Sequence, residues 1–128
     1  MNEMPQGWPT DWLGESLAEL GDGSRIRCQI LLTDGYTSVH VGNYASIMQQ
    51  WDGLWPAAKE TIQKILSDYG RDSKIQATGN FLQISIPPEP IGPGVNWSIA
   101  LQKSGGDGVW DATFDGWEID PGESQPYF

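Results

Sequence analysis

The chain has 128 residues, which is enough for one compact domain and too few for two ordinary ones, so we expect a single domain over residues 1–128. Its 17 acidic and 7 basic residues give a net charge of −10. That charge disfavours nucleic acid as a partner, because binding there depends on basic groups that replace the counterions of the phosphates. The apolar runs are short and the amino terminus is neither basic nor apolar, so we expect no signal peptide, no membrane contact and a cytoplasmic protein.

The first expected element is a short amphipathic helix over Asp11 to Leu20. Thr10 or Asp11 can cap its amino end, leucines recur at helical spacing, and Gly21 can close it in the left-handed conformation.

The stretch RIRCQILLTDGYTSVHVG then predicts a β-hairpin, since an Asp-Gly pair between two alternating runs is a strong turn signal. With that pair as the loop, Ile30 lies opposite Val39. The same register predicts that Cys28 points into the core and that His40 points to solvent.

The middle of the chain has apolar residues at three- and four-residue steps, which is typical of helix. Proline disfavours helix at the residue before it, so we expect a short helical piece ending near Trp51 and a main helix from Pro56 to Tyr69. Gly70 is expected to end the main helix.

The remaining chain predicts strands. A second hairpin is expected with Gly79 and Asn80 as its loop and Ala77 opposite Leu82. The proline-rich segment 87–94 cannot continue a sheet ladder and is expected to be a loop, after which NWSIALQKS alternates as a strand should.

The stretch VWDATFDGWEID sets aromatic residues among acids. Alternation predicts that Trp110, Ala112 and Phe114 face the core while the residues between them face water. Gly116 then forms either an Asp-Gly hairpin or a bulge, and both return Trp117 and Ile119 to the buried side.

No metal, cofactor or catalytic residue is expected from these patterns. A calcium loop beginning at Asp111 has Thr113 at its third position and Gly122 where a bidentate Glu is needed. A Cys-His dyad requires Cys28 and His40 to meet, yet the predicted hairpin places them on opposite faces. Paired carboxylates keep a carboxylate-dependent enzyme open as an alternative.

Two features suggest binding. No Lys or Arg follows Lys103, although the last part of the chain is rich in acids, and such a surface attracts basic proteins. The seven tryptophans exceed what a small core usually needs, and those bordering Pro or Gly, Trp8, Trp12 and Trp55, are expected to be partly exposed. An alternative is therefore a small-molecule or carbohydrate site on exposed tryptophan. The expected partner-binding residues are Asp111, Asp115, Glu118, Asp120 and Trp55.

A helix ending in ILSDYG, the strands after it and the final W-x-x-x-F-D-G-W strand resemble small acidic bacterial α+β proteins grouped with the immunity proteins of polymorphic toxin systems. The resemblance covers about residues 56 to 120. It implies a non-catalytic protein whose acidic face blocks a basic toxin domain, often a nuclease. The expected fold is α+β, two-layer, with an antiparallel sheet of about five to six strands and the helices packed on one face.

Overall fold

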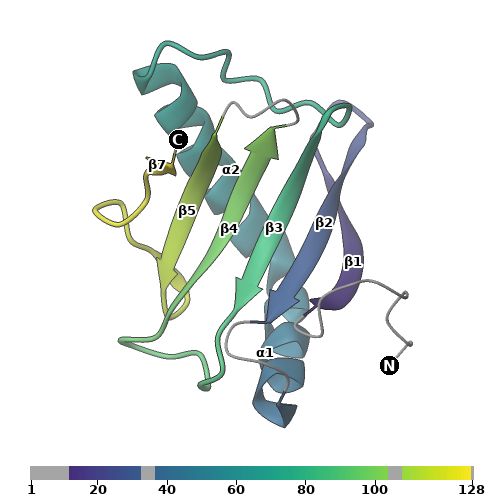
Figure 1. Cartoon of the computed structure of the whole chain (residues 1–128), viewed down its shortest axis with the longest axis vertical. Helices are drawn as coiled ribbons and strands as arrows, with labels where there is room; N and C mark the ends of the chain where they lie inside the picture. The colour runs from purple at the N-terminus through teal and green to yellow at the C-terminus, as the bar shows by residue number, and fades with distance from the viewer. Residues whose placement is uncertain (1–11, 33–36, 104–107, 128) are drawn as a thin grey trace.

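The computed structural model describes residues 12–32, 37–103 and 108–127, and these residues form helices and one sheet (Figure 1). The helices are α1 (Ser38–Gln49) and α2 (Trp51–Asp68). The strands are β1 (Trp12–Glu19), β2 (Arg25–Leu32), β3 (Asn80–Ile86), β4 (Asn96–Lys103), β5 (Val109–Asp115), and the two-residue strands β6 (Glu118–Ile119) and β7 (Pro126–Tyr127).

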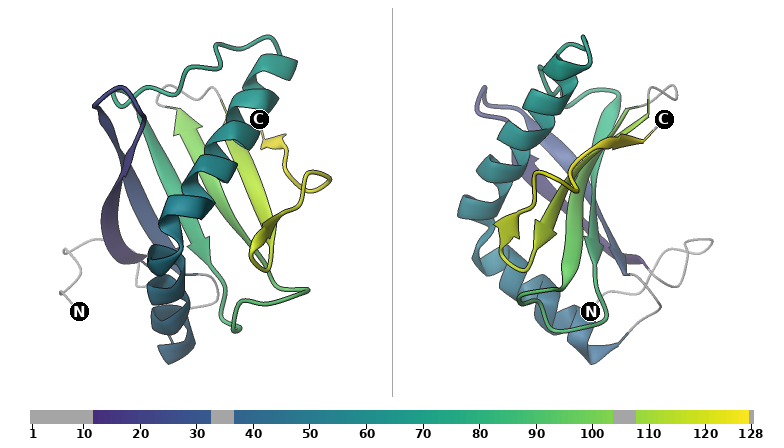
Figure 2. Two further views of the ribbon diagram at one scale, coloured as in Figure 1. Left: turned by 180° about the vertical axis from the view of Figure 1, so that it is seen from behind. Right: turned by 90° about the vertical axis from the view of Figure 1, so that its left-hand side faces the viewer.

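The strands lie in the order β1-β2-β3-β4-β5-β6, and β7 also pairs with β5. The α+β class is confirmed, but the expected all-antiparallel sheet is wrong, because β2 and β3 run parallel with Ile30 opposite Ile84. The chain leaves β2, passes through both helices and returns as β3, and such a crossover gives a parallel pair. The sheet is curled around α2 as a half-barrel, with both helices on one side of it (Figure 2).

Residues 12–19 form strand β1, so the helix predicted over Asp11 to Leu20 is wrong. The pairing of β1 with β2 sets Ala18 opposite Ile26 and directs Ala18 into the core, while Leu17 is 58% exposed. The leucines of this segment therefore do not line one face of a helix. Pairing with an apolar neighbour strand outweighs local propensity here.

The segment after β2 is helix α1, so the predicted pairing of Ile30 with Val39 is wrong, while its loop, residues 33–36, lies outside the described residues. Thr37 caps the helix: its side chain accepts from the His40 N–H, and the Thr37 N–H donates to Nδ1 of His40 at 3.1 Å. His40 is consequently buried in α1 and does not point to solvent.

The two helices meet near Gln50, and α2 runs unbroken through Pro56. The predicted boundary at Pro56 is wrong, because the proline lies early in α2 and the helix continues through it. The missing N–H of Pro56 removes one helical hydrogen bond, and the burial of Trp55 keeps the residue before the proline in the helix. The predicted end is confirmed within a residue: α2 ends at Asp68, and Gly70 follows with a φ of 70°.

The predicted second hairpin is also wrong, since the residues before Asn80 are not a strand. Leu82 lies opposite Cys28 on one side and Leu101 on the other, so β3 is a central strand. The proline-rich segment is a loop and the strand after it is β4, both as predicted.

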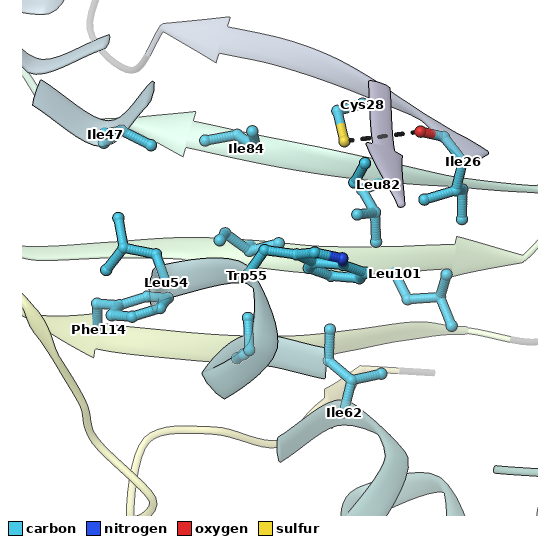
Figure 3. Close-up of a cluster of buried hydrophobic side chains, with 14 of the residues drawn as sticks. Ile26, Cys28, Ile47, Leu54, Trp55, Ile62, Leu82, Ile84, Leu101 and Phe114 are labelled. Carbon is cyan, nitrogen blue, oxygen red and sulfur yellow. Dashed lines mark hydrogen bonds between the residues drawn. The ribbon is translucent and has the colours of Figure 1, made fainter. Parts of the chain in front are cut away.

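The core lies between α2 and the concave face of the sheet (Figure 3). Trp55, Ala58, Ile62 and Leu66 recur along one stripe of α2 and are almost fully buried. The sheet contributes alternate residues of its strands, including Ile26, Cys28, Leu82, Ile84, Leu101, Trp110 and Phe114. The opposite, helix-free face of the sheet is left to the residues between them.

Candidate functional site

The candidate site is built on the turn between β5 and β6. Asp115 lies directly opposite Glu118, so the loop consists of Gly116 and Trp117, one residue beyond the predicted Asp-Gly pair. Gly116 has a φ of 60°, which glycine adopts without steric cost, and its carbonyl accepts from the indole N–H of Trp97 at 2.6 Å. A hairpin therefore forms in place of a bulge, but the predicted Asp-Gly loop is wrong, because Asp115 is paired in the ladder.

The tail after β6 covers the outer edge of β5. The N–H of Asp120 donates to the carbonyl of Thr113 at 2.8 Å, and the N–H of Thr113 donates to Oγ of Ser124 at 2.9 Å. Further along, the N–H of Asp111 donates to the carbonyl of Gln125 at 3.2 Å. An uncovered edge strand invites pairing with another chain, so this tail protects β5 from strand addition.

Asp111 is half-buried on the helix-free face, opposite Ala100 of β4. Burial raises the pKa of its carboxyl to about 6, and the hydroxyl of Thr113, which donates to Oδ1 at 3.2 Å, opposes that shift. The predicted outward direction of Asp111 is confirmed. The neighbouring strands nevertheless shield its carboxyl from solvent more than the carboxyl of a fully exposed acid is shielded.

The other predicted acids surround the turn. Asp115 and Glu118 are exposed, and Oδ1 of Asp115 accepts from the N–H of Gly94 at 2.7 Å. Asp120 follows β6, and its Oδ1 accepts from the N–H of Gly122 at 3.1 Å. The structure therefore brings Asp115, Glu118 and Asp120 together at one corner, with Asp111 further along β5.

These carboxylates have no basic counterpart in the part of the chain whose side chains the structure describes: no Lys or Arg there lies within ion-pair distance of them. The ion pair that the structure shows, between Arg25 and Glu19 at 3.5 Å, lies at the β1 edge of the sheet. Among the described side chains, no basic residue therefore compensates the charge of the corner.

A hollow of about 540 Å³ adjoins this corner on the helix side, between the amino-terminal half of α2 and the β5–β6 turn. Trp117 forms part of its wall and packs edge-to-face on Trp97, with ring centroids 6.1 Å apart. The hollow is lined by Gln50, Gly53, Leu54, Ala57, Phe114, Trp117, Glu118 and Ile119. We call it the Trp117 hollow.

The residues of α2 that line the Trp117 hollow are candidate functional residues that the sequence analysis did not identify. Residues of α2 and of the β5–β6 turn are far apart in the chain, and the neighbourhood arises only from the packing of α2 across the sheet. The sequence signal for this site is a tryptophan directly after the turn residue Gly116.

Trp55 does not belong to this site, and its predicted exposure is wrong. Its indole is 5% exposed, and its Nε1–H donates to the carbonyl of Glu19 at 2.6 Å. Trp51, one turn earlier, stacks on Trp55 with ring centroids 6.1 Å apart and is only partly buried. Trp8 lies outside the described residues.

A second hollow, of about 350 Å³, lies beside Trp51 between β1 and α2. Asp52 and Glu19 line it, but so does Lys59, whose Nζ donates to the carbonyl of Leu20 at 2.6 Å. A ligand there meets groups of both signs, and we call this space the Trp51 hollow.

Cys28 and His40, the two residues considered for nucleophilic chemistry, both lie in environments that serve the fold. Cys28 is fully buried as predicted, and burial raises the pKa of its thiol to about 12, which suppresses the reactive thiolate. His40 is occupied in the cap of α1, with Nδ1 2.9 Å from Oγ1 of Thr37. Neither environment activates a nucleophile.

Among residues 12–32, 37–103 and 108–127, the structure brings together no group of His, Cys, Asp and Glu residues that suits a metal ion. Within the same ranges, neither helix has the length and apolar character needed to cross a bilayer.

Comparison with known proteins adds no relative: no family model, no curated protein and no solved structure matches this chain.

Proposed function

We propose that this protein binds a basic protein through the acidic corner formed by the β5–β6 turn and the tail, and that it acts by binding and not by catalysis. The observation that carries the proposal is the set of carboxylates at this corner that have no Lys or Arg counterpart among the described side chains. The resemblance to toxin-immunity proteins supports a basic toxin domain as the class of partner.

An uncompensated acidic surface has a physical use in association. Complementary charges steer two proteins together at long range and raise the association rate, most strongly at low ionic strength. Surface ion pairs add little to folding stability, so leaving these acids unpaired costs the fold little. The Trp117 hollow next to the corner supplies the aromatic surface that protein interfaces favour.

We also propose a cytoplasmic location. A free, buried Cys28 suits a reducing compartment, where disulfides are rare.

The test is charge reversal at Glu118 of the corner and at Glu123 of the adjoining tail, whose carbonyl accepts from the hydroxyl of Thr113 at 3.3 Å. The double variant Glu118→Lys with Glu123→Lys changes two exposed residues, so we expect folding stability to change by less than about 0.5 kcal/mol per substitution. Association with a purified basic protein encoded beside this gene is expected to slow by about 10-fold or more at low salt, and its salt dependence is expected to flatten. Stopped-flow kinetics at several salt concentrations measures both.

The matched control is Asp22→Lys with Asp72→Lys. It alters net charge equally, at one exposed residue in the β1–β2 turn and one in the segment after α2. Both segments lie away from the β5–β6 turn (Figure 1). If this control slows association as much as the corner variant does, total charge drives the effect and the corner is not the docking site. An unchanged rate in the corner variant at low salt rejects the proposal.

A further inference from the structure

The Trp117 hollow is lined mostly by apolar residues, with one acidic residue, Glu118, among them. Leu54 of α2 lies over Phe114 of β5, as Figure 3 shows, and these two side chains are 6% and 1% exposed. Ile119 and Trp117 add further apolar surface from the turn. Leu54 and Phe114 close the floor of the hollow, and the partly buried Trp117 and Ile119 offer the apolar surface against which the hydrocarbon part of a side chain can lie.

Glu118 carries the one charge among the described residues that line this hollow. Its carboxylate is exposed, and no hydrogen bond to it is seen within the described parts of the chain. Asp115, directly opposite on the turn, is engaged elsewhere, since its Oδ1 accepts from the N–H of Gly94 at 2.7 Å. The Trp51 hollow differs, because Lys59 lines it and Arg25 pairs with its Glu19.

We propose that the Trp117 hollow receives an arginine side chain of a basic protein partner, an inference that rests on the proposed function. An arginine places three methylenes against the apolar wall while its charged end stays at the rim. Its planar guanidinium stacks on an aromatic ring and pairs with a carboxylate at the same time. Glu118 and Trp117 offer both groups on adjacent residues.

Lysine fits this hollow less well than arginine. Its ammonium is a compact, strongly hydrated charge that neither stacks on an indole nor bonds a carboxylate through two parallel donors. A purely apolar side chain fits less well too, since it would strip water from Glu118 without replacing the lost hydrogen bonds. The hollow thus selects a long side chain with a flat cationic end.

The direct test titrates the folded protein with blocked Gly-X-Gly tripeptides in which X is arginine, lysine or citrulline, the neutral isostere of arginine. Indole N–H signals in nitrogen-15 NMR spectra report the site of binding. The arginine peptide is expected to shift the Trp117 signal and to leave the Trp51 signal in place. The citrulline peptide is expected to bind several-fold more weakly.

Glu118→Gln is the matched variant, because it keeps the size of an exposed side chain and removes only its charge. We expect it to weaken the arginine peptide by about 2- to 5-fold, the range of an exposed ion pair, and to leave citrulline binding unchanged. Asp52→Asn, in the Trp51 hollow, is expected to change neither.

Equal binding of arginine and citrulline peptides, an arginine-dependent shift at Trp51 in place of Trp117, or no effect of Glu118→Gln would each overturn the arginine pocket. Those results leave the acidic corner standing if its charge reversal still slows association with the protein partner. Conversely, an arginine pocket in the tripeptide titration with no effect of charge reversal on the partner rejects the proposed function alone.

Discussion

The two edges of the sheet differ in how their charged side chains and their backbone groups are used. At the β1 edge, Glu19 pairs with Arg25, and Lys59 of α2 donates to the carbonyl of Leu20, so charged groups are used within the fold. At the β5 edge, the tail supplies the hydrogen bonds of the strand through backbone groups and Ser124, and the exposed carboxylates of Asp115 and Glu118 have no basic partner among the described side chains. The β5 edge is thus closed to strand addition and open to side-chain docking.

The comparison of the two edges separates the residues that stabilise the fold from the exposed residues that a partner can contact. The buried residues of β5 stabilise this edge and the hydrogen bonds of the tail complete it. The carboxylates add single hydrogen bonds, such as the one that Oδ1 of Asp115 accepts from the N–H of Gly94. The comparison predicts that substitutions on the inner face of β5 cost much stability, substitutions in the turn cost less, and substitutions of the acids cost least.

The largest effect is expected from Phe114→Ala. Phe114 is 1% exposed and stacks on Trp97 with ring centroids 4.4 Å apart, so the change leaves a cavity under the β5 edge. We expect a loss of about 3 to 5 kcal/mol of unfolding free energy, measured by urea denaturation. Leu17→Ala at the β1 edge is the control, since Leu17 is 58% exposed and is expected to cost less than about 1 kcal/mol. Similar losses for the two variants would contradict the assignment of inner and outer faces.

A smaller loss is expected from Gly116→Ala in the β5–β6 turn. Gly116 has a φ of 60°, and an added Cβ would lie 3.0 Å from the backbone carbon and oxygen of Gly92. Strain and close approach together should cost about 1 to 3 kcal/mol. Denaturation midpoints compared with the wild type measure the loss.

Gly79→Ala separates the two causes of that loss. Gly79 has a similar φ of 76°, but nothing lies within 4 Å of the added Cβ, so only backbone strain of about 1 kcal/mol is expected. If both variants lose the same stability, the contact of the turn with the proline-rich loop has no energetic weight.

Sequence patterns predicted the β5 side of the molecule far better than the β1 side. Strict alternation over β4 and β5 identified their inner residues, because Trp110 and Phe114 have few other stable positions than a core. The amino-terminal part of helix α1 was not predicted because two of its buried positions are the polar residues His40 and Asn43. Its apolar residues therefore followed the alternation that is typical of a strand.

The parallel pairing of β2 with β3, and with it the position of the Trp117 hollow, follows from that missed helix. A hairpin after β2 would have kept the sheet antiparallel, whereas two helices carry the chain to the opposite end of the sheet before β3 begins. Asn43 then fixes the proline-rich loop by donating to the carbonyls of Pro87 and Glu89, at 3.0 and 2.7 Å. No periodicity in the sequence encodes these long-range contacts.

The smallest effect is expected from Asp111→Asn and takes the form of a pH dependence. Burial raises the pKa of Asp111 from 3.8 to about 6, so the folded protein holds this proton more tightly than the unfolded chain does. The resulting contribution to stability is fully present below about pH 4 and is lost as the pH rises through 6. Asparagine keeps an oxygen that accepts from the hydroxyl of Thr113, as Asp111 does, but does not titrate. The variant should therefore gain stability relative to the wild type between pH 4 and pH 7, measured by thermal unfolding at fixed ionic strength. Asp115→Asn, at the exposed end of the same strand, controls for the loss of one negative charge. A stability difference for Asp111→Asn that stays constant with pH would show that this carboxyl is fully solvated, and one that falls as the pH rises would show that the fold stabilises its charged form. Either result would contradict the burial of Asp111 at the β5 edge.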